Sequence, residues 1–590
     1  MTDYLGRMPV ERLFDIPRRQ LAEFPKPDAI ATKEGGQWRP YSTTEMVETS
    51  ERLALGLLAL GIGPGDRVAI CSGNRSEWCM VDQAILRIGA ITVPIYPTSS
   101  KEDHAYILKH AEAKACFSGN AEIHAKGVQA EGTCHLFTFD RVDGVKHWTE
   151  VMTLGDPAAK PKLAEYEARV KRDDLATIIY TSGTTGKPKG VMLTHGNILS
   201  NVEGSLTRFP IDHTAKAISF LPLSHIYERM LMYLYMQAGV SIYFQESLEE
   251  LGERIREVQP HVFTAVPRLL EKIYDKIVAK GEALTGIKRQ LFFWALDLGH
   301  RYEVHGRSPW YNLQLALARK LIFSKWQAAL GGNVRICASG SAALQPRLAR
   351  VFNAAGIPLM EGYGLTESSP VISVNDMRND GLRFGSVGRP IPNVQVRIAE
   401  DGEILAKGPN IMIGYYLEPE LTRETVDADG WLHTGDIGEI TSEGFLCITD
   451  RKKEIFKTSG GKYVAPQVLE NKLKESRFIE QVMVIGENRK FPAALIVPDF
   501  AFLKDYCALK DIPFVTKEQV ITDQRVRDRI FAEVGKANTD VGHWEQVKKI
   551  ALLPAELTIE GGELTPSLKL RRKPIMAKYA ALVEGIYAEG

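Results

Sequence analysis

The fold is decided by residues 175–190, which read LATIIYTSGTTGKPKG. The apolar, β-branched start predicts a buried strand, which delivers the following residues to the carboxyl edge of a sheet. Those residues offer four hydroxyls (Thr181, Ser182, Thr184, Thr185), three glycines (Gly183, Gly186, Gly190) and two cations (Lys187, Lys189). Backbone N–H groups, hydroxyls and cations that crowd together favour an anion. We therefore predict a phosphate-binding loop.

Two other interpretations fit this loop less well. A Walker A loop needs Gly, four residues and then Gly-Lys-Ser/Thr. Counted from Gly183, Pro188 stands where the second glycine belongs, and Lys187 is followed by proline. A flexible linker would explain the Ser, Thr and Gly content, but it would not explain why the loop directly follows a buried strand.

The chain is long enough for several domains. It has 590 residues, 44% of them hydrophobic and 25% charged, which is typical of a globular protein and too long for one core. Between residues 66 and 360, short β-branched runs alternate with helical patterns, so we predict a parallel sheet with helices on both faces. The runs lie at residues 67–70, 91–94, 175–180, 217–221, 240–244, 261–266 and 334–338.

The pattern changes after Pro390. Closely spaced strands with tight turns follow, and they predict a small antiparallel subdomain. The charged run Asp450-Arg451-Lys452-Lys453-Glu454 suits a linker, and the helices and strands beyond it suit a smaller α+β domain. We therefore expect an N-terminal domain at residues 1–449, a hinge at 450–453 and a C-terminal domain at 454–590.

Charge and cysteine content narrow the partners and the compartment. Lys plus Arg and Asp plus Glu both number 73, so no chain-wide field would hold the protein to nucleic acid. The seven cysteines lack zinc-ligand or redox spacing, which fits a reducing cytoplasm. The first residues resemble no secretory signal, and the most apolar stretch, residues 231–244, is shorter than the roughly 20 residues that span a bilayer.

Four further motifs follow the loop in order. They are Glu361-Gly-Tyr-Gly-Leu-Thr-Glu367, Thr434-Gly-Asp436, Asp450-Arg-Lys-Lys-Glu454 and Leu564-Thr-Pro-Ser-Leu-Lys569. Together with YTSGTTGKPKG, this set closely resembles the signatures of adenylate-forming enzymes, which include acyl-CoA synthetases, firefly luciferases and nonribosomal peptide adenylation domains. The motifs run from Tyr180 to Lys569, about two-thirds of the chain.

The resemblance implies a fold and a reaction. The fold would be α/β, with a large N-terminal domain of doubly wound mixed sheets plus the antiparallel subdomain, and a smaller mobile α+β C-terminal domain. In the reaction, a carboxylate attacks the α-phosphorus of ATP, pyrophosphate leaves, and coenzyme A takes the acyl group from the acyl-AMP. Two like charges 4 Å apart repel by about 4 kcal/mol at an effective dielectric of 20, so preorganised donors and cations must offset that repulsion.

The resemblance also implies roles for single residues. Besides the loop from Thr181 to Lys189, the ATP and AMP site would comprise Ser339, Gly340, Ser341, Glu361, Gly362, Tyr363, Gly364, Thr366, Asp436, Arg451 and Lys569. Tyr363 would stack on adenine, and Asp436 would accept hydrogen bonds from both ribose hydroxyls. Glu367 would supply a hard oxygen ligand to Mg2+, with the hydroxyl of Thr184 beside it, and both are predicted to be catalytic.

The C-terminal domain would carry the catalytic Lys569. Leu568 stands before it where many family members have glycine, and the nearby Lys573 is the alternative. The domain would turn about a hinge made of Asp450, Lys452 and Lys453. Coenzyme A would then pass Ser459, Gly460 and Gly461, where glycines let a pantetheine arm approach the backbone.

Two segments bear on the acid that is activated. Residues 221–229 (LPLSHIYER) and 258–270 resemble segments of long-chain acyl-CoA synthetases. His225 would be catalytic near the carboxylate, and a fatty-acid tunnel would be lined by His225, Tyr235, Met236 and Gly239. The aromatic and basic residues 288–326, with Trp294, Trp310 and Trp326, would suit contact with a membrane surface.

We therefore predict a long-chain fatty acid–CoA ligase that uses ATP and coenzyme A as co-substrates and Mg2+ as cofactor. The alternatives are a fatty acyl-AMP ligase that loads a carrier protein, and a non-catalytic protein that binds nucleotide or fatty acid. The expected location is the cytoplasm. A homodimer and a peripheral contact with the inner face of the membrane are left open.

Overall fold

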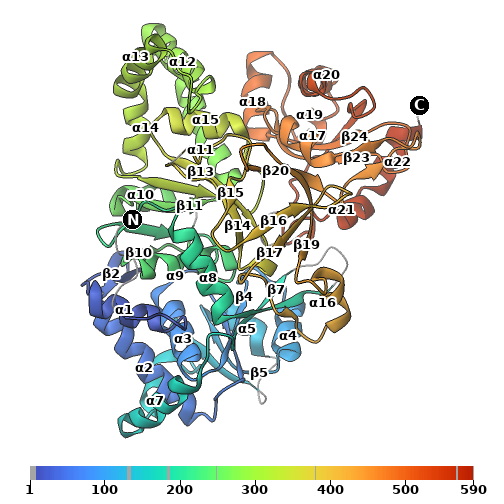
Figure 1. Cartoon of the computed structure of the whole chain (residues 1–590). Helices are drawn as coiled ribbons and strands as arrows, with labels where there is room; N and C mark the ends of the chain where they lie inside the picture. Colours follow the sequence, from blue (N-terminus) through green and yellow to red (C-terminus); the bar gives the residue numbers. More distant parts are fainter. Residues whose placement is uncertain are drawn as a thin grey trace. The chain divides into compact units, whose positions relative to one another are not determined.

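The computed structural model describes residues 8–128, 134–181, 187–247, 249–378, 380–565 and 569–588. The chain forms two compact units (Figure 1). The first comprises Met1–Arg397, Leu405–His433 and Ser442–Leu446, and the second comprises Ile398–Ile404, Thr434–Thr441 and Cys447–Gly590. Across the described residues, no helix is both long and apolar enough to cross a membrane. All seven cysteines are free thiols.

The first unit contains a seven-stranded sheet in the order β18-β8-β7-β4-β3-β5-β6. Its strands β3, β4, β5, β6 and β7 are parallel, whereas β8 runs antiparallel to β7, and β18 runs antiparallel to β8. The bounds are β3 Arg67–Cys71, β4 Ile91–Ile95, β5 Ala113–Ser118, β6 His135–Thr138, β7 Leu175–Thr181, β8 Lys189–Thr194 and β18 Gly414–Tyr415. The tight return from β7 into β8 makes this sheet mixed.

A nine-stranded sheet in the same unit has the order β15-β14-β13-β12-β11-β9-β10-β1-β2. Its central strands β9 to β13 and β1 are parallel, and its two edges are antiparallel. The bounds are β1 Ile30–Glu34, β2 Gln37–Tyr41, β9 Lys216–Ser219, β10 Ser241–Phe244, β11 Val262–Ala265, β12 Ile336–Ser339, β13 Leu359–Gly364, β14 Val371–Val374 and β15 Arg389–Pro390.

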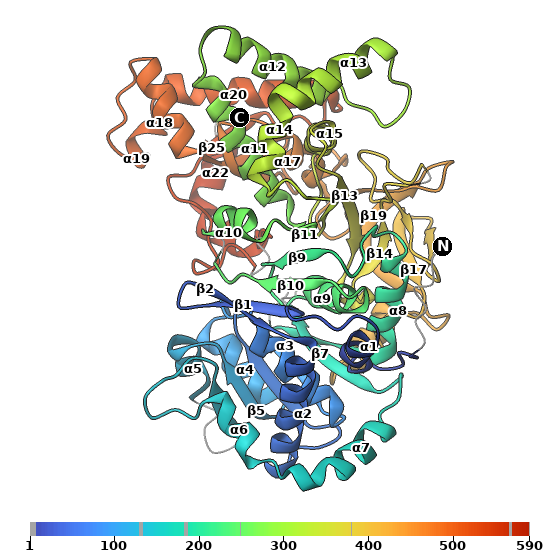
Figure 2. The same cartoon turned by 90° about the vertical axis from the view of Figure 1, so that its left-hand side faces the viewer.

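The α/β class and the mixed sheets are confirmed, and each of the seven predicted runs contains a strand. The expectation of a single parallel sheet was wrong, because the runs divide between two sheets. The helices α3 (Ser76–Arg87) and α9 (Ile226–Gln237) lie between these sheets (Figure 2). Helix α3 packs on β1 of one sheet and on β3 and β4 of the other, and α9 packs on β9 and β10.

A four-stranded sheet in the order β16-β17-β19-β20 accounts for the closely spaced strands after Pro390. Its strands are β16 Gln395–Ile398, β17 Glu403–Lys407, β19 Leu432–Ile440 and β20 Leu446–Arg451, and their residues belong partly to each unit.

The second unit has a core around the three-stranded sheet β23-β24-β25, with β23 Ile479–Ile485, β24 Ala493–Pro498 and β25 Lys549–Leu552. Helices α17 (Pro466–Leu473), α18 (Phe500–Leu509), α20 (Gln524–Ala537) and α22 (Ala580–Ala588) contribute further buried side chains to this core. A hairpin of β21 (Phe456–Lys457) and β22 (Tyr463–Val464) precedes them.

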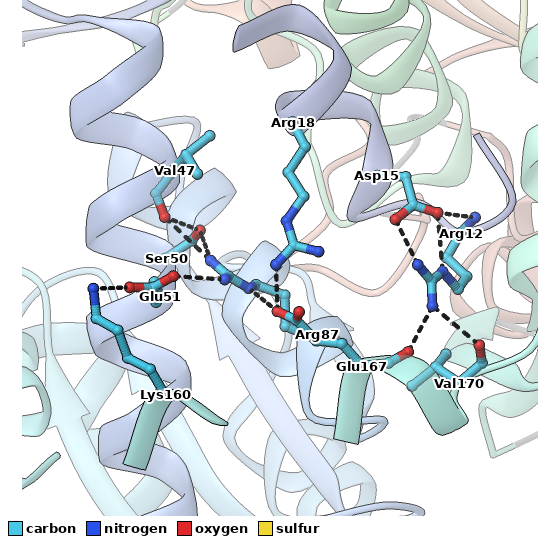
Figure 3. Close-up of polar contacts among 10 residues, drawn as sticks. All are labelled: Arg12, Asp15, Arg18, Val47, Ser50, Glu51, Arg87, Lys160, Glu167 and Val170. Atoms are coloured by element: carbon cyan, nitrogen blue, oxygen red, sulfur yellow. Dashed lines mark hydrogen bonds and ion pairs between the residues drawn. The ribbon is translucent and has the colours of Figure 1, made fainter. Parts of the chain in front are cut away.

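In the first unit, arginines in and before the N-terminal helix α1 (Asp15–Glu23) form hydrogen bonds that hold it to neighbouring helices (Figure 3). Arg12 makes two charge-assisted hydrogen bonds to Asp15, each 2.9 Å long. Its Nη1 also donates to the carbonyl of Glu167 at 2.6 Å, at the end of helix α7 (Lys160–Arg169). The last carbonyls of a helix lack intrahelical partners, so Arg12 supplies a donor where α7 needs one.

The side chain of Glu167 joins three helices in the same network. Its Oε1 accepts hydrogen bonds from Arg18 of α1 at 2.6 Å and from Arg87 of α3 at 2.7 Å. Arg87, whose side chain is 3% exposed, also pairs with Glu51 of α2 (Thr43–Ala59), and Glu51 pairs in turn with Lys160 at the surface. Glu167 is therefore the more deeply buried of the two carboxylates that compensate the Arg87 guanidinium.

We expect Glu167→Ala to destabilise the first unit by more than about 2 kcal/mol, because it leaves Arg87 and Arg18 without their shared carboxylate. Lys160→Ala removes an ion pair whose lysine side chain is 59% exposed, and it should cost less than about 1 kcal/mol. Urea unfolding of the two variants measures the difference. Equal losses would show that Glu167 acts as an ordinary surface charge.

Candidate active site

The ends of the predicted phosphate loop lie side by side. Strand β7 ends at Thr181, β8 begins at Lys189, and these two residues pair directly. The ammonium group of Lys187 lies 5.3 Å from the ring centroid of Tyr106. Ser182, Gly183, Thr184, Thr185 and Gly186 lie outside the described residues. The described ends thus bring two loop lysines to the edge of the sheet where β7 stops.

Tyr415 connects this edge to Glu367. Its hydroxyl donates a 2.7 Å hydrogen bond to Glu367 Oε1, and the ammonium of Lys189 lies 5.5 Å from its ring centroid. Pairing of β18 with β8, with Tyr415 opposite Val191, holds the ring there. Burial and the nearby Glu367 carboxylate raise the pKa of Tyr415, so the phenol remains a donor. The structure therefore gathers Lys189 and Glu367, two predicted site residues, around a tyrosine that the motifs did not reveal.

Two buried asparagines fix the turn that follows Glu367. Asn201 and Asn410 both donate to the carbonyls of Ser368 and Val371, at 2.7 to 3.2 Å. Asn201 also accepts a hydrogen bond from the Val371 N–H at 3.1 Å. Because both side chains are fully buried, these bonds fix the turn rigidly against helix α8 (His195–Leu206).

The residues predicted to bind adenine lie at and after the ends of β12 and β13. Ser339 and Glu361 are neighbours in the register, and Glu361 Oε1 accepts a 2.9 Å hydrogen bond from the Leu344 N–H. Burial raises the pKa of Glu361 to about 8, so the neutral acid is favoured at neutral pH. A Cβ at Gly340 would lie 3.2 Å from the ring of Tyr227, which shows how closely this loop approaches helix α9.

Steric crowding explains why the motif at residues 361–367 contains glycines. A Cβ at Gly364 would lie 1.8 Å from the Pro370 carbonyl oxygen, and one at Gly362 would lie 3.3 Å from Val374. Tyr363 stands between them with 9% of its surface exposed, where the β13–β14 register shifts. Thr366 opens the short helix η4 (Thr366–Ser368), and Ser341 has a φ of +70°. The predicted residues Ser339–Ser341 and Glu361–Thr366 thus lie on adjacent elements.

His225 is the N-terminal cap of helix α9. Its Nδ1 accepts a 3.1 Å hydrogen bond from the Tyr227 N–H, so a neutral ring carries its proton on Nε2. Tyr235 and Met236 are buried near the other end of the helix, about 15 Å away by the helical rise. Gly239 has a φ of +72° in the turn after the helix, against His213 and Phe24. The tunnel assignment of these three residues stays a prediction.

One turn beyond His225, Arg229 forms an ion pair with Asp82 in which both side chains are 0% exposed, at 2.6 Å. Thr92 of β4 donates to the same carboxylate oxygen at 2.7 Å, and Tyr233 donates to the other oxygen. The second Nη of Arg229 donates to the hydroxyl of Thr177 of β7 at 2.7 Å. Sequence patterns gave no sign of this network, because its members come from four separate segments.

The network bears on the phosphate loop through β7. Thr177 and Thr181 are four residues apart on one strand, so their side chains point to the same face. His225, the cap of helix α9, precedes Arg229 by four residues. The Arg229–Thr177 hydrogen bond therefore ties the helix that His225 caps to the strand that ends at the loop.

In the second unit, Asp436 and Arg451 lie on neighbouring strands, with Arg451 Nε 3.4 Å from Asp436 Oδ1. The predicted hinge residue Lys452 pairs with Asp401 at 2.6 Å and with Glu403 at 2.9 Å. Burial raises the pKa of Asp450, which accepts a bond from the Arg451 N–H, to about 7. Lys453 follows as a surface residue.

Further along the second unit, Thr565 and Lys569 are joined by two hydrogen bonds. The Lys569 N–H donates to Thr565 Oγ1 at 3.0 Å, and the Thr565 N–H donates to the Lys569 carbonyl at 2.9 Å. Leu568 lies outside the described residues. Ser459, Gly460 and Gly461 form the tip of the β21–β22 hairpin, where Gly461 has a φ of +74°. Lys573 lies in the first turn of α21 (Arg572–Lys578).

Comparison with protein families places both parts of the chain. Residues 18–416 match the AMP-binding enzyme family, and residues 453–590 match the AMP-binding enzyme C-terminal domain. The chain belongs to the AMP-binding enzyme family. Its known relatives include long-chain-fatty-acid–CoA ligase FadD15 of Mycobacterium bovis, 36% identical over 94% of this chain and 93% of that protein. Long-chain-fatty-acid–CoA ligase 1 of Homo sapiens is 32% identical over 94% and 82%, respectively.

Solved structures agree with the fold of this AMP-binding enzyme. The adenylation domain of a carboxylate reductase from Mycobacterium chelonae superposes with a TM-score of 0.75 at 22% identity, covering 99% of this chain and 92% of that one. An o-succinylbenzoate coenzyme A synthetase of Bacillus subtilis, solved with ATP and magnesium, gives a TM-score of 0.68 at 20% identity, covering 95% and 98%. The expected adenylate-forming fold is confirmed.

A first prediction for this AMP-binding enzyme compares two buried threonines of one network. Thr177→Val removes the contact between α9 and the loop strand, whereas Thr92→Val removes a contact to Asp82 on the neighbouring strand. Each should cost about 1–3 kcal/mol of stability. We expect Thr177→Val to lower kcat/KM for ATP in pyrophosphate release at least about threefold more than Thr92→Val.

Thr177→Ser keeps the hydroxyl and should restore most of that loss. If Thr177→Ser is as impaired as Thr177→Val, or if the two valine variants match in both stability and kcat/KM, the threonine has no positioning role.

A second prediction concerns pH. The carboxyl of Glu361 is neutral in the folded enzyme up to about pH 8, but it ionises near its ordinary pKa in the unfolded chain. Folding therefore takes up a proton between those two values, and wild-type stability falls as pH rises through that window. Glu361→Gln lacks this cost, so its stability relative to wild type should improve from pH 5 to pH 8 and then level off. Urea unfolding at several pH values tests this, and a constant difference would refute it.

Proposed function

We propose that this AMP-binding enzyme is a long-chain fatty acid–CoA ligase, which forms an acyl-AMP from ATP and then an acyl-CoA, releasing pyrophosphate and AMP. The observation that carries the proposal is similarity to ligases of that name over 94% of the chain, in a bacterium and in a mammal. The motifs at residues 180–190 and 361–367 lie within the first matched family domain, and the motif at residues 564–569 lies within the second, which supports the proposal.

In the first step, the enzyme must bring a carboxylate to the already anionic α-phosphate. The loop after β7 offers hydroxyl donors and Lys187 and Lys189, and Thr366 would contact the α-phosphate. Glu361 favours its neutral form near pH 7, so its carboxyl group would not repel an anionic ligand. Tyr363 and the loop at Ser339–Ser341 would hold the adenine, and Asp436 with Arg451 would hold the ribose.

A magnesium ion fits the described residues in one way. Within the described part of the chain, no group of three or more His, Cys, Asp or Glu side chains is arranged to hold a metal. Mg2+ is commonly bound by one or two carboxylates together with substrate phosphates and water. Glu367 meets that need, since Tyr415 engages Oε1 and orients the carboxylate. The bound ion would neutralise phosphate charge, and Thr184 would be its hydroxyl partner.

The second unit would act in turn on both steps. Lys569 would place its ammonium between the carboxylate and the α-phosphate in one pose. A turn about Asp450, Lys452 and Lys453 would then withdraw it and present Ser459, Gly460 and Gly461 to coenzyme A. The thiol is itself a good nucleophile toward a mixed anhydride, so this step needs access more than it needs a base.

The acyl chain would enter beside His225, with Tyr235, Met236 and Gly239 along its tunnel. We place the enzyme in the cytoplasm, where its free thiols stay reduced. A homodimer remains a prediction.

The test measures both half-reactions with purified protein, ATP, Mg2+, coenzyme A and a panel of acids from short-chain to long-chain. We expect pyrophosphate release that depends on a long-chain acid, and matching thioester formation. Lys569→Ala should lower adenylation at least about a hundredfold, the usual cost of losing one transition-state donor. Starting from synthetic acyl-AMP and coenzyme A, the same variant should form thioester near the wild-type rate.

Lys573→Ala is the matched control and should be mild. Acyl-AMP that accumulates without thioester would favour a ligase that loads a carrier protein, and absence of acid-dependent pyrophosphate release would favour a binding protein. If Lys573→Ala abolishes adenylation and Lys569→Ala does not, the lysine assignment is wrong.

A further inference from the structure

One helical segment of the first unit exposes an unusual row of large apolar side chains. It consists of α13 (Pro309–Ala318), η3 (Arg319–Phe323) and α14 (Ser324–Ala329), which follow one another without a break. The row, called the apolar stripe below, contains four side chains with exposed fractions of 66%, 62%, 49% and 42%: Trp310, Leu313, Leu317 and Leu321.

The stripe is a second apolar face on a helix that already has one. The buried face carries Leu315, Ala318, Phe323 and Trp326, all part of the core beneath it. The stripe residues follow at intervals of three or four, so they share the opposite side of the helix. A surface helix needs only one apolar face to join a core. Packing into the core therefore does not explain why the helix has a second, exposed apolar face.

The exposed fractions show that only one of the three tryptophans predicted to contact a membrane faces solvent. Of the three expected at a membrane, Trp326 is 5% exposed and packs against Phe323 and Phe352, and Trp294 is half-buried against the core. Only Trp310 of these three is exposed. The outward surface is thus narrower than the sequence suggested and is centred on α13.

Basic residues outnumber acidic ones in and beside the segment that carries the stripe. From residue 304 to residue 360 the sequence contains no Asp or Glu. Lys320 and Lys325, which lie on the same helical segment as the stripe, are exposed. Helix α12 (Gly286–His300), which packs on α13 and η3, begins with the exposed residues Ile287, Lys288 and Arg289. Exposed basic side chains therefore lie on the same helical segment as the apolar stripe and at the start of the helix packed against it.

We propose that the apolar stripe, with Lys320 and Lys325 beside it, docks this enzyme on the surface of an anionic lipid bilayer. An interfacial helix buries its apolar side chains at the level of the headgroups, a tryptophan prefers that boundary, and lysines reach anionic headgroups while their stems cover apolar surface. The absence of acidic residues fits a negatively charged lipid surface.

This docking surface goes beyond the proposed ligase activity and does not depend on it. It would place the enzyme where long-chain acids partition, so that an acid could pass from the bilayer to the enzyme. The half-reactions with dispersed substrate do not need the contact.

The test uses the full chain and vesicles of phosphatidylcholine with phosphatidylglycerol, compared with pure phosphatidylcholine. Wild type should co-sediment with the anionic vesicles, and less so at high salt. Leu313→Glu together with Leu317→Glu should lower the partition coefficient at least about tenfold. Lys320→Gln together with Lys325→Gln leaves the apolar side chains in place and should lower it about fivefold per lysine, on anionic vesicles only.

The matched control is Leu509→Glu with Val515→Glu in the second unit, where the side chains are 78% and 70% exposed. It adds the same charge and should bind vesicles like wild type. Pyrophosphate release with dispersed acid should match wild type in all variants, which shows that they fold. Trp310→Phe should lose part of the vesicle-dependent shift in fluorescence.

Two results would overturn the proposal. One is wild-type protein that does not sediment with anionic vesicles, or a double glutamate variant that sediments as well as wild type. The other is a wild-type dimer in analytical ultracentrifugation that this variant dissociates, because a second copy of the chain would then cover the stripe.

Discussion

The buried ion pair between Arg229 and Asp82 is the constraint on which the arrangement of the first unit depends. A charge removed from water is tolerated only when its partners satisfy it, and removal of one partner leaves the other uncompensated. Burial alone would lower the pKa of Arg229, but Asp82 and Tyr233 together more than offset this effect, and the net shift is upward. The pair joins α3 to α9, and Thr177 adds β7, so the helices between the two sheets cannot shift without breaking it.

The carboxyl groups near this pair divide into two kinds. Asp82 has a cation and remains the acceptor of three donors. Glu228, next to Arg229 in sequence, is held by the hydroxyl of Thr264 at 2.7 Å, and burial raises its pKa to about 7. Glu361 on β13 behaves similarly. Buried carboxyls without a cation thus tend to be neutral, which limits the negative charge around a site for an anionic nucleotide.

Much of this architecture could be predicted from sequence, for a local reason. Runs such as residues 91–94 and 334–338 are β-branched and flanked by helical patterns, and strands form at both. The loop after β7 was recognisable because its residue types and its place after a strand agree. What could not be predicted is pairing between distant segments. The contact of Tyr415 with Glu367 spans 48 residues, and the bond from Arg229 to Asp82 spans 147. No local propensity encodes which strands share a sheet, so the strand pattern alone indicated one parallel sheet, and only the family resemblance implied the mixed sheets that the chain forms.

The geometry around Tyr415 shows how one side chain can serve two opposite charges. An ammonium is attracted to the negative face of an aromatic ring, whereas a phenolic hydroxyl donates to a carboxylate. Lys189 uses the face of Tyr415 and Glu367 uses its hydroxyl, so the ring orients both charges. A direct ion pair would have used the lysine to neutralise the glutamate. With the ring as intermediary, the cation can still meet a phosphate and the carboxylate can still meet a metal, which is the combination that a magnesium nucleotide requires.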